Sequence, residues 1–332
     1  MRKTSLTFGN YIYEWYMTYK FPKHQITTRN VCLTYINIHI KPSRLGRLYL
    51  KNVKTKEIQQ FLSELFINGN KSILKASNKA RGLSPWTVKK IRSLIIAALN
   101  QAVHEHLITE NVAFYTENIK IFNAPKRIFS LKEQKLFLND AKNYRYYLAY
   151  VLLFFTGCRR SEILGLSWND IHFTDNTIFI SQVLVVVNNK PCLKSIPKNR
   201  NSIRNIPVHK EIMAMLRAYK EEQDLYFTKH RYYNKYNLVF CTLKGDFYNP
   251  NNLLQNMKKR LKKLGLPTDL HIHSTRHTFA TNLIHAKVAI PDIQKLGGWS
   301  SPDVLLNTYA HTLLPTQIKA VNNLYEIYKK NK

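Results

Sequence analysis

The chain has 332 residues, enough for about two domains of ordinary size. Hydrophobic residues make up 45% of it, so the composition provides for buried cores and excludes a mainly disordered chain. Lysine and arginine number 51 against 20 aspartates and glutamates, a formal net charge of +31, and this excess indicates an anionic partner, with nucleic acid as the first candidate.

Cysteine usage and hydropathy favour a soluble, cytoplasmic protein. The four cysteines are widely scattered: Cys32, Cys158, Cys192 and Cys241. They form no C-x-x-C pair, which argues against a disulfide framework or a zinc knuckle and favours four ordinary buried thiols. The N-terminus lacks the apolar core of a signal peptide, and no run of about 18 apolar residues predicts a membrane span.

The first 120 residues or so predict a helical domain. Two stretches, "TFGNYIYEWYMTYK" and "TKEIQQFLSELF", carry apolar residues at helical spacing. The predicted buried faces are Phe8, Ile12, Trp15 and Tyr19 in the first helix and Ile58, Phe61, Leu62 and Leu65 in the second.

The clearest helix is "SPWTVKKIRSLIIAALNQAVHEH", where Ser84 suits the N-cap and Pro85 the first helical position. Its apolar stripe is Val88, Ile91, Leu94, Ile95, Ala98, Leu99, Ala102 and Val103. Lys89, Lys90 and Arg92 lie off that stripe, where they either meet phosphates or merely solvate the face.

A polar, basic stretch around Pro125 separates this part from a second one and predicts an interdomain linker. Ser130 and Glu133 form a capping-box pattern at the start of the next helix. The stretch "YYLAYVLLFFTG" is apolar nearly all round, so we expect a buried helix that ends at Gly157.

The second part mixes strands and helices. Runs of β-branched residues within 176–208 predict a small antiparallel sheet. Helical patterns follow at 209–222, 250–264, 274–287, 290–296, 301–310 and 316–329. The predicted fold class is therefore mainly α with a small antiparallel β-sheet.

Three short motifs contain charged or reactive side chains that could take part in catalysis. In "TGCRRSEILGL", Arg159 and Glu162 are three apart and share a helix face, a spacing also typical of weak surface ion pairs. In "KLGGWSSPDVLLNTYAH", Gly297 ends one helix, and Ser301 with Pro302 begins the next. Tyr309 falls near the end of that last helix.

The third motif is "HIHSTRH", in which Ser274 is the predicted N-cap and Arg276 lies one turn into a helix. His273 and His277 have metal-ligand spacing, but Ser274 stands where H-E-x-x-H needs glutamate. A helix N-terminus and an arginine together favour an anion over a metal cation. We expect His277 either to be structural or to support the catalytic residues from behind, and His271 to be buried and satisfied.

Taken together, these motifs resemble the tyrosine recombinase (phage integrase) family. Arg159 resembles the family's first catalytic arginine and Glu162 its acidic partner, while His273 and Arg276 match its H-x-x-R motif. Trp299 stands where the family usually has histidine and sometimes tryptophan.

Two further positions complete the resemblance. Lys198 stands where the family has its β-hairpin lysine, although Asn199 follows it where threonine is usual, which makes Arg200 a secondary candidate. Tyr309 stands at the nucleophile position. The spacings 299 − 276 = 23 and 309 − 299 = 10 are usual for the family.

The resemblance implies a helical, SAM-like core-binding domain over 1–120, a linker at 121–128 and an α+β catalytic domain over 129–332. Because the core-binding pattern begins almost at the first residue, we expect no additional arm-binding domain. The C-terminal segment 316–329 either packs on its own domain or docks on a neighbouring protomer.

The implied activity is site-specific cleavage and rejoining of double-stranded DNA through a 3′-phosphotyrosyl intermediate, for integration or excision of a mobile element. It needs no metal or nucleotide cofactor. The implied assembly is a tetramer on DNA, with possible accessory DNA-bending or excision factors and nucleoid association. A non-cleaving DNA-binding regulator and a metal-dependent nuclease using His273 and His277 are the alternatives.

Overall fold

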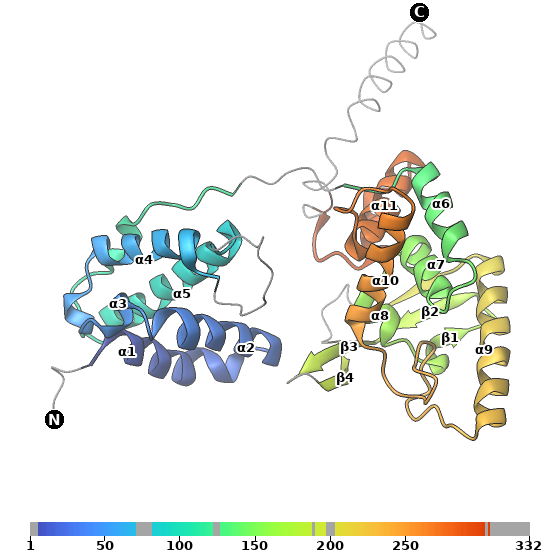
Figure 1. Ribbon diagram of the computed structural model, residues 1–332, viewed down its shortest axis with the longest axis horizontal. Helices are drawn as coiled ribbons and strands as arrows, with labels where there is room; N and C mark the ends of the chain where they lie inside the picture. The colour runs from blue at the N-terminus through green and yellow to red at the C-terminus, as the bar shows by residue number, and fades with distance from the viewer. Residues whose placement is uncertain are drawn as a thin grey trace, which may run out of the picture. The chain divides into compact units, whose positions relative to one another are not determined.

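The computed structural model describes residues 6–70, 82–121, 127–187, 190–196, 203–302 and 305. The chain divides into two compact units, Met1–Asn123 and Ala124–Lys332, each with a hydrophobic core of its own (Figure 1). The division lies inside the stretch 121–128. Among the helices in the described ranges, none is both long and apolar enough to cross a membrane.

The described part of the N-terminal unit is built of helices (Figure 1, blue to cyan). The α-helices are α1 (Phe8–Trp15), α2 (Ile26–Thr34), α3 (Arg44–Arg47), α4 (Thr55–Asn68) and α5 (Pro85–His104). Short π- or 3₁₀-helical pieces lie between and after them: η1 (Tyr16–Lys20), η2 (Phe21–Lys23), η3 (Tyr35–Ile40), η4 (Leu50–Asn52) and η5 (Val112–Tyr115).

Local sequence signals placed most of this unit correctly. The four predicted core residues of α4 are all buried, and Ser84 caps α5 by accepting from the backbone N–H of Thr87. The prediction for Tyr19 was wrong, because the chain widens into the i→i+5 turns of η1 after Trp15. This change of period turns Tyr19 outward, where it is 40% exposed and its hydroxyl donates to Glu105.

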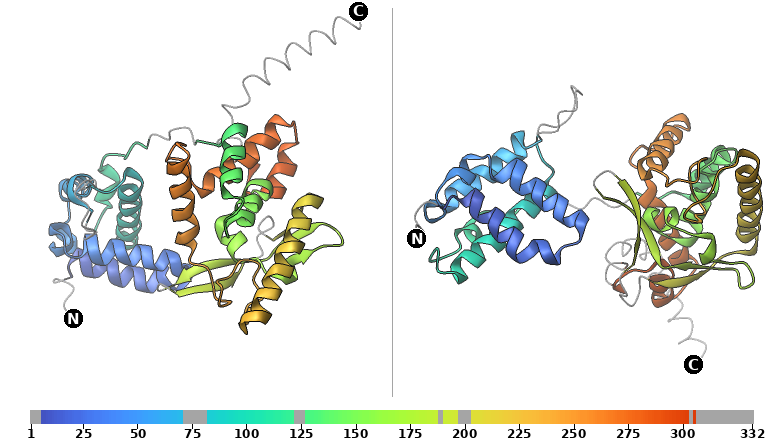
Figure 2. Two further views of the ribbon diagram at one scale, coloured as in Figure 1. Left: turned by 45° about the vertical axis from the view of Figure 1, so that its right-hand side comes forward. Right: turned by 90° about the horizontal axis from the view of Figure 1, so that it is seen from below.

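The C-terminal unit combines helices with two short sheets (Figure 2). Its helices are α6 (Leu131–Ala141), α7 (Tyr147–Thr156), α8 (Arg160–Leu164), the 3₁₀ helix η6 (Trp168–Asp170), α9 (Lys210–His230), α10 (Pro250–Lys263), α11 (Ile272–His285) and α12 (Ile290–Gly297). Its strands are β1 (Ile171–His172), β2 (Thr177–Ile180), β3 (Gln182–Val187), β4 (Lys190–Ser195) and β5 (Arg204–Pro207).

The predicted single sheet is in fact two. Strands β1, β2 and β5 form one antiparallel sheet in that order, and β3 pairs only with β4. The split follows from the packing of β3 on α8. A Cβ on Gly165 would lie 2.7 Å from the backbone nitrogen of Leu184, so only glycine lets β3 lie against the end of α8.

Helix α7 is buried on nearly every side, as its sequence predicts, with Phe155 as the exposed exception. It ends at Gly157, whose φ of 64° is the left-handed conformation of a C-cap. The capping box of Ser130 and Glu133 at the start of α6 is present. Helix α11 packs along α7, and this pairing brings the ends of both helices to the candidate site.

Two further details differ from expectation. Helix α9 continues to His230, beyond the predicted 222, because its polar second half keeps helix-forming residues up to the left-handed cap at Arg231. All four cysteines are free, but only Cys158 and Cys241 are buried. The predicted helix at 301–310 is described only in part, and the one at 316–329 lies outside the described residues.

Gly157 and Gly265 provide a matched pair for testing the packing beneath the site. Both have a φ of 64°, but a Cβ on Gly157 would lie 2.3 Å from Cδ1 of Phe279, whereas one on Gly265 would meet nothing within 4 Å. We expect Gly265→Ala to lower the free energy of unfolding by about 1–2 kcal/mol, the cost of the left-handed backbone alone. Gly157→Ala should cost a further ~1–3 kcal/mol, because Phe279 must move.

Urea unfolding of the two variants, followed on the transition of the C-terminal unit, measures this difference. Equal losses in the two variants would show that Phe279 yields without cost and that the predicted close packing is wrong.

Candidate active site

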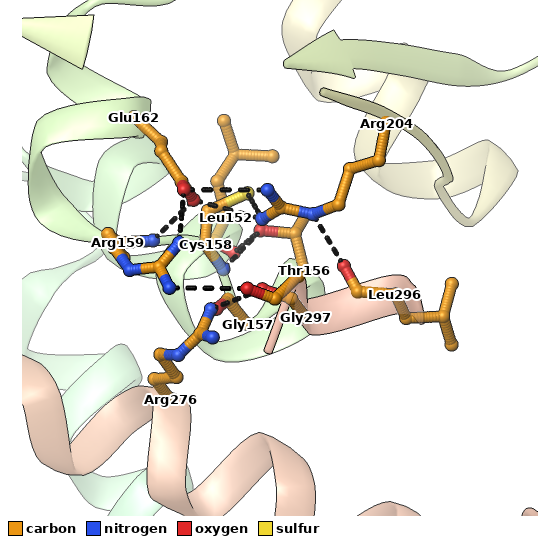
Figure 3. A network of polar contacts seen from close by, with 11 residues as sticks. Leu152, Thr156, Gly157, Cys158, Arg159, Glu162, Arg204, Arg276, Leu296 and Gly297 are labelled. Atoms are coloured by element: carbon orange, nitrogen blue, oxygen red, sulfur yellow. Dashed lines mark hydrogen bonds and ion pairs between the residues drawn. The ribbon is translucent and has the colours of Figure 1, made fainter. Parts of the chain in front are cut away.

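The candidate site begins with an ion pair at the start of α8. The backbone N–H of Arg159 donates to Oε2 of Glu162 at 2.8 Å, and its Nη1 donates to Oε1 at 2.7 Å (Figure 3). Arg159 and Glu162 do share a helix face, but the pair is not the surface pair that this spacing usually makes. The side chain of Glu162 is 2% exposed, whereas that of Arg159 is 42% exposed.

A second arginine, Arg204 on β5, binds the same carboxylate. Its Nη2 donates to Oε2 of Glu162 at 2.9 Å, and its Nε donates to the carbonyl of Leu296 at 2.8 Å. The side chain of Arg204 is 4% exposed. Sequence reasoning missed this residue. The available signal was the position of Arg204 between Ile203 and Ile206 in "SIRNIPV", where a strand is predicted and a buried charge is kept only with a partner.

A third arginine, Arg276 on α11, is itself almost fully buried. Its Nη1 donates to the carbonyls of Gly157 at 2.6 Å and Gly297 at 2.5 Å. The guanidinium lies 3.8 Å from the ring centroid of Trp299, an arrangement that a cation–π contact stabilises. Among the described residues, the buried Nη2 of Arg276 has no hydrogen-bond partner.

Three consecutive carbonyls at the end of α12 each accept a hydrogen bond from a different arginine. Leu296 accepts from Arg204 at 2.8 Å, Gly297 from Arg276 at 2.5 Å and Gly298 from Arg159 at 3.2 Å. The last carbonyls of a helix lack partners within it and carry partial negative charge, so they suit cationic donors.

Glycine at 297 and 298 makes this arrangement possible. Gly298 has a φ of 68°, the left-handed conformation that ends the helix. A Cβ on Gly297 would lie 1.7 Å from the ring of Trp299, which would displace the ring from Arg276.

The electrostatics of the cluster favour an anion. Three guanidinium groups surround one carboxylate, which leaves an excess of two positive charges. Burial, followed by the nearby Arg159, lowers the pKa of Arg276 to about 9, so this arginine stays charged at neutral pH. Burial alone would raise the pKa of Glu162, but Arg204 and Arg159 outweigh burial and hold that pKa below its ordinary value.

The histidines lie at the start of α11. The helix begins at Ile272, and its N-cap is His271, whose Nδ1 accepts from the backbone N–H of Ser274. The predictions for Ser274 as N-cap and for a buried His271 were therefore wrong. Histidine can cap as serine does, because an unprotonated ring nitrogen is an acceptor, and the cap holds His271 at the exposed helix end.

His273 is exposed and His277 is buried, with their rings perpendicular and 4.8 Å apart. Across the described ranges, no group of three or more histidine, cysteine, aspartate or glutamate side chains is placed to hold a metal ion.

The remaining predicted residues are not part of the described cluster. Lys198 and its substitute Arg200, and the predicted nucleophile Tyr309, lie outside the described residues. In the N-terminal unit, Lys90 is exposed and Lys89 half-buried on α5.

Arg92, the third predicted DNA contact, is engaged within its own unit. Its Nε and Nη2 donate to the hydroxyl and carbonyl of Thr116 at 2.8 and 2.9 Å. These two bonds fasten the end of η5 to α5, so Arg92 has a structural task that Lys89 and Lys90 do not share.

Glu162→Gln tests the buried charge at the centre of the cluster. We expect the free energy of unfolding at pH 7 to fall by about 3 kcal/mol, because two buried or half-buried arginines lose their counter-charge. Since the pKa of Glu162 is lowered by folding, its stabilising effect is complete above the unfolded pKa of about 4.3. The effect is lost as pH falls through the lower folded value, so the difference between wild type and variant should shrink there.

Urea unfolding at pH 7 and between pH 5 and 3 measures this dependence. Asp224→Asn is the control, because it breaks an ion pair with Lys220 in which the side chains are 58% and 38% exposed. The control should cost at most about 1 kcal/mol. A Glu162→Gln variant that differs from wild type by the same amount at every pH would refute the assignment of a buried, ionised carboxylate.

Comparison with known proteins places this geometry in a family. Residues 126–314 match the phage integrase family, and residues 7–66 match the N-terminal SAM-like domain of phage integrases. The chain is 27% identical over 309 residues to a tyrosine recombinase XerC-like protein of Caldanaerobacter subterraneus subsp. tengcongensis, with 87% of this chain and 75% of that protein covered.

Two further relatives belong to mobile elements by their names. The chain is 23% identical to the ICEBs1 integrase of Bacillus subtilis, with 72% of this chain and 64% of that protein covered. It is 30% identical to transposase A from transposon Tn554 of Staphylococcus aureus, with 67% of this chain and 59% of that protein covered. The chain thus spans less than two thirds of the length of both.

Solved structures show the same fold. The integrase of transposon Tn1549 in complex with transposon right-end DNA superposes with a TM-score of 0.79 at 21% identity, covering 96% of this chain and all of that one. A lambda integrase dimer bound to a core site superposes with a TM-score of 0.64 at 17% identity, covering 92% of this chain and 78% of that one. With the family match extending over more than half of its length, this chain belongs to the phage integrase family, whose members are tyrosine recombinases.

Proposed function

We propose that this protein is a site-specific recombinase that cleaves and rejoins double-stranded DNA through a 3′-phosphotyrosyl intermediate, for integration or excision of a mobile element. The observation that carries the proposal is the convergence of Arg159 and Arg276 beside one buried carboxylate, with charge left over for an anion. The net charge of +31 fits a polyanionic substrate.

The two arginines suit the transition state of phosphoryl transfer. An oxygen that attacks a phosphodiester builds negative charge on the non-bridging oxygens, and planar guanidinium groups bind such oxygens well. Arg159 presents a half-exposed side chain, and among the described residues the buried Nη2 of Arg276 has no hydrogen-bond partner, so it keeps a donor that a phosphate oxygen would satisfy. Trp299 lies against Arg276 and keeps its guanidinium in place.

The proton transfers fall to residues other than the arginines. In the proposed reaction the phenolic oxygen of Tyr309 forms a bond to phosphorus, and the bond from phosphorus to the 5′-oxygen breaks. His273, exposed at the start of α11, accepts the phenolic proton, and Lys198 donates a proton to the departing oxygen. The phosphotyrosine bond conserves the energy of the broken one, so no nucleotide is needed, and the arginines supply the positive charge that a metal ion would otherwise bring.

The two parts of the chain take different tasks in this proposal. Residues 1–120 bind the DNA around the cleavage site, with Lys89 and Lys90 on α5 as phosphate contacts, and 129–332 carry out the chemistry, joined by the linker 121–128. Arg92, the third predicted DNA contact, also holds Thr116 through its Nε and Nη2. The working assembly is a tetramer on two DNA sites, aided by accessory DNA-bending or excision factors. It acts in the cytoplasm, associated with the nucleoid.

The nucleophile is tested with Tyr309→Phe. Radiolabelled duplexes that tile the DNA on either side of the gene are incubated with wild type, and the covalent protein–DNA adduct is trapped by denaturation. The variant should give no adduct, because phenylalanine lacks the attacking oxygen, while its affinity for the duplex stays within about threefold of wild type.

Tyr233→Phe, a change at a 77% exposed tyrosine of the same unit, is the matched control and should react as wild type does. Adduct formation by Tyr309→Phe would refute the nucleophile. Salt-sensitive binding without adduct on any duplex, by the wild type itself, would indicate a non-cleaving regulator.

If Arg159 and Arg276 supply the positive charge that stabilises the transition state, a chelator should leave the reaction unchanged. Adduct formation should proceed at the same rate with and without EDTA, because the transition-state charge is bound by Arg159 and Arg276. Loss of the reaction in EDTA and its recovery with added zinc would instead support a nuclease site at His273 and His277.

A further inference from the structure

The proposed chemistry leaves the most buried ion pair of the cluster without a task. Arg204 and Glu162 have side chains that are 4% and 2% exposed, and neither touches the phosphate in the scheme above. A buried ion pair contributes little net stability compared with well-packed apolar residues of the same size. A role in the reaction would account for keeping this costly pair beside two catalytic arginines.

The geometry around Glu162 suggests what that role is. Its Oε2 is occupied by Nη2 of Arg204 at 2.9 Å and by the backbone N–H of Arg159 at 2.8 Å, while Nη1 of Arg204 approaches Oε1 at 3.4 Å. The side chain of Arg159 therefore reaches only Oε1, through Nη1, and its Nη2 binds Gly298 instead. Arg204 and the backbone N–H of Arg159 thus occupy Oε2 together, and the guanidinium of Arg159 binds Glu162 through one nitrogen.

Arg204 also binds the end of α12, whose carbonyls hold the other two arginines. Its Nε bond to the carbonyl of Leu296 joins β5 to the end of α12, directly before the carbonyls that hold Arg276 and Arg159 (Figure 3). A shift of these carbonyls would move both guanidinium groups together.

We infer that Arg204 is a positioning residue for DNA cleavage, which it serves by holding Glu162 and the Leu296–Gly298 carbonyls so that Arg159 and Arg276 stay aimed at the phosphate. This inference rests on the proposed function. Arg204 itself does not contact the reacting atoms.

The same contacts set how the site responds to pH. Glu162 is faced by Arg204 from β5, by Arg159 and the Cys158 thiol from the loop before α8, and by Arg276 from α11. Burial works against its ionised form, and Arg204 is the largest opposing influence. Without Arg204, the carboxyl should take up a proton at a higher pH, and a protonated Glu162 no longer holds Arg159.

The test compares Arg204→Met and Arg204→Lys with a matched control, Arg260→Met. Arg260 also has a 4% exposed side chain paired with a carboxylate, Asp140, and it stacks on Tyr144, but it takes no part in the cluster. Each variant is mixed in excess with a nicked form of the duplex that wild type attacks. The single-turnover rate of adduct formation is measured at saturating DNA from pH 5 to 8, alongside the dissociation constant and the melting temperature.

Arg204→Met should form adduct ~10–100-fold more slowly, as expected of misplaced catalytic groups, with DNA affinity within about threefold of wild type. The acidic limb of its pH profile should move to higher pH, because Glu162 has lost an opposite charge. Arg204→Lys should also react about tenfold more slowly, since an ammonium group lacks the planar fork that reaches both Glu162 and Leu296, but should keep the wild-type pH profile.

Arg260→Met should melt at a lower temperature yet keep the rate and pH profile of wild type. The inference is overturned if Arg204→Lys, which retains the charge and folds, reacts within twofold of wild type, or if Arg260→Met slows the reaction as much as Arg204→Met. Absence of adduct from wild type would count against the proposed function itself, whereas a wild-type adduct with unaffected Arg204 variants would remove only the role of Arg204.

Discussion

The rest of the site depends on one buried carboxylate. Glu162 accepts from Arg159 and Arg204 at once, and it does so inside the core of the C-terminal unit. An ionised group at such a depth is stable only with charged partners, so its position dictates that two arginines converge on it from α8 and β5. Arg204 also binds the carbonyl of Leu296 at the end of α12. The next carbonyl, that of Gly297, binds Arg276 and so connects this third arginine to the other two.

This constraint explains features of the backbone that have no other evident purpose. The carbonyls of Gly157 and Gly297 both bind Nη1 of Arg276, and they belong to the C-terminal ends of two different helices, α7 and α12. Left-handed glycines at 157 and 298 end those helices abruptly. Abrupt ends leave carbonyls without helical partners, and here the partners are arginines. At position 297, glycine is also the only residue type that leaves room for Trp299 to lie against the Arg276 guanidinium.

Local patterns predicted the helices well, because capping and periodicity depend on a few neighbouring residues. Ser84, the capping box of Ser130 and Glu133, and the end of α7 at Gly157 are all of this kind. Two of the misses have non-local causes. The packing of β3 on α8 depends on the space beside Gly165. The role of Arg204 depends on its ion pair with Glu162, which forms only when the chain folds. The assignment of Arg159, Glu162, His273, Arg276 and Trp299 came from ordered motifs, while the structure adds how the arginines are held. The catalytic roles of these five residues stay predictions, as do those of Lys198 and Tyr309.

The cluster is assembled by the protein alone, which has a consequence for catalysis. Each arginine is held by carbonyls or by Glu162, so a phosphate that binds has no need to order them first. Positive groups fixed in advance stabilise developing charge better than groups that must be ordered during the reaction. Two predicted residues remain. In the chain, Lys198 lies six residues before Arg204, and Tyr309 lies ten residues after Trp299. Through its bond to Leu296, Arg204 joins β5, the strand that follows the predicted general acid in the chain, to the end of α12, the helix that precedes the predicted nucleophile. The contact that holds the arginines in place is therefore made by the two described elements that flank these predicted residues in the sequence.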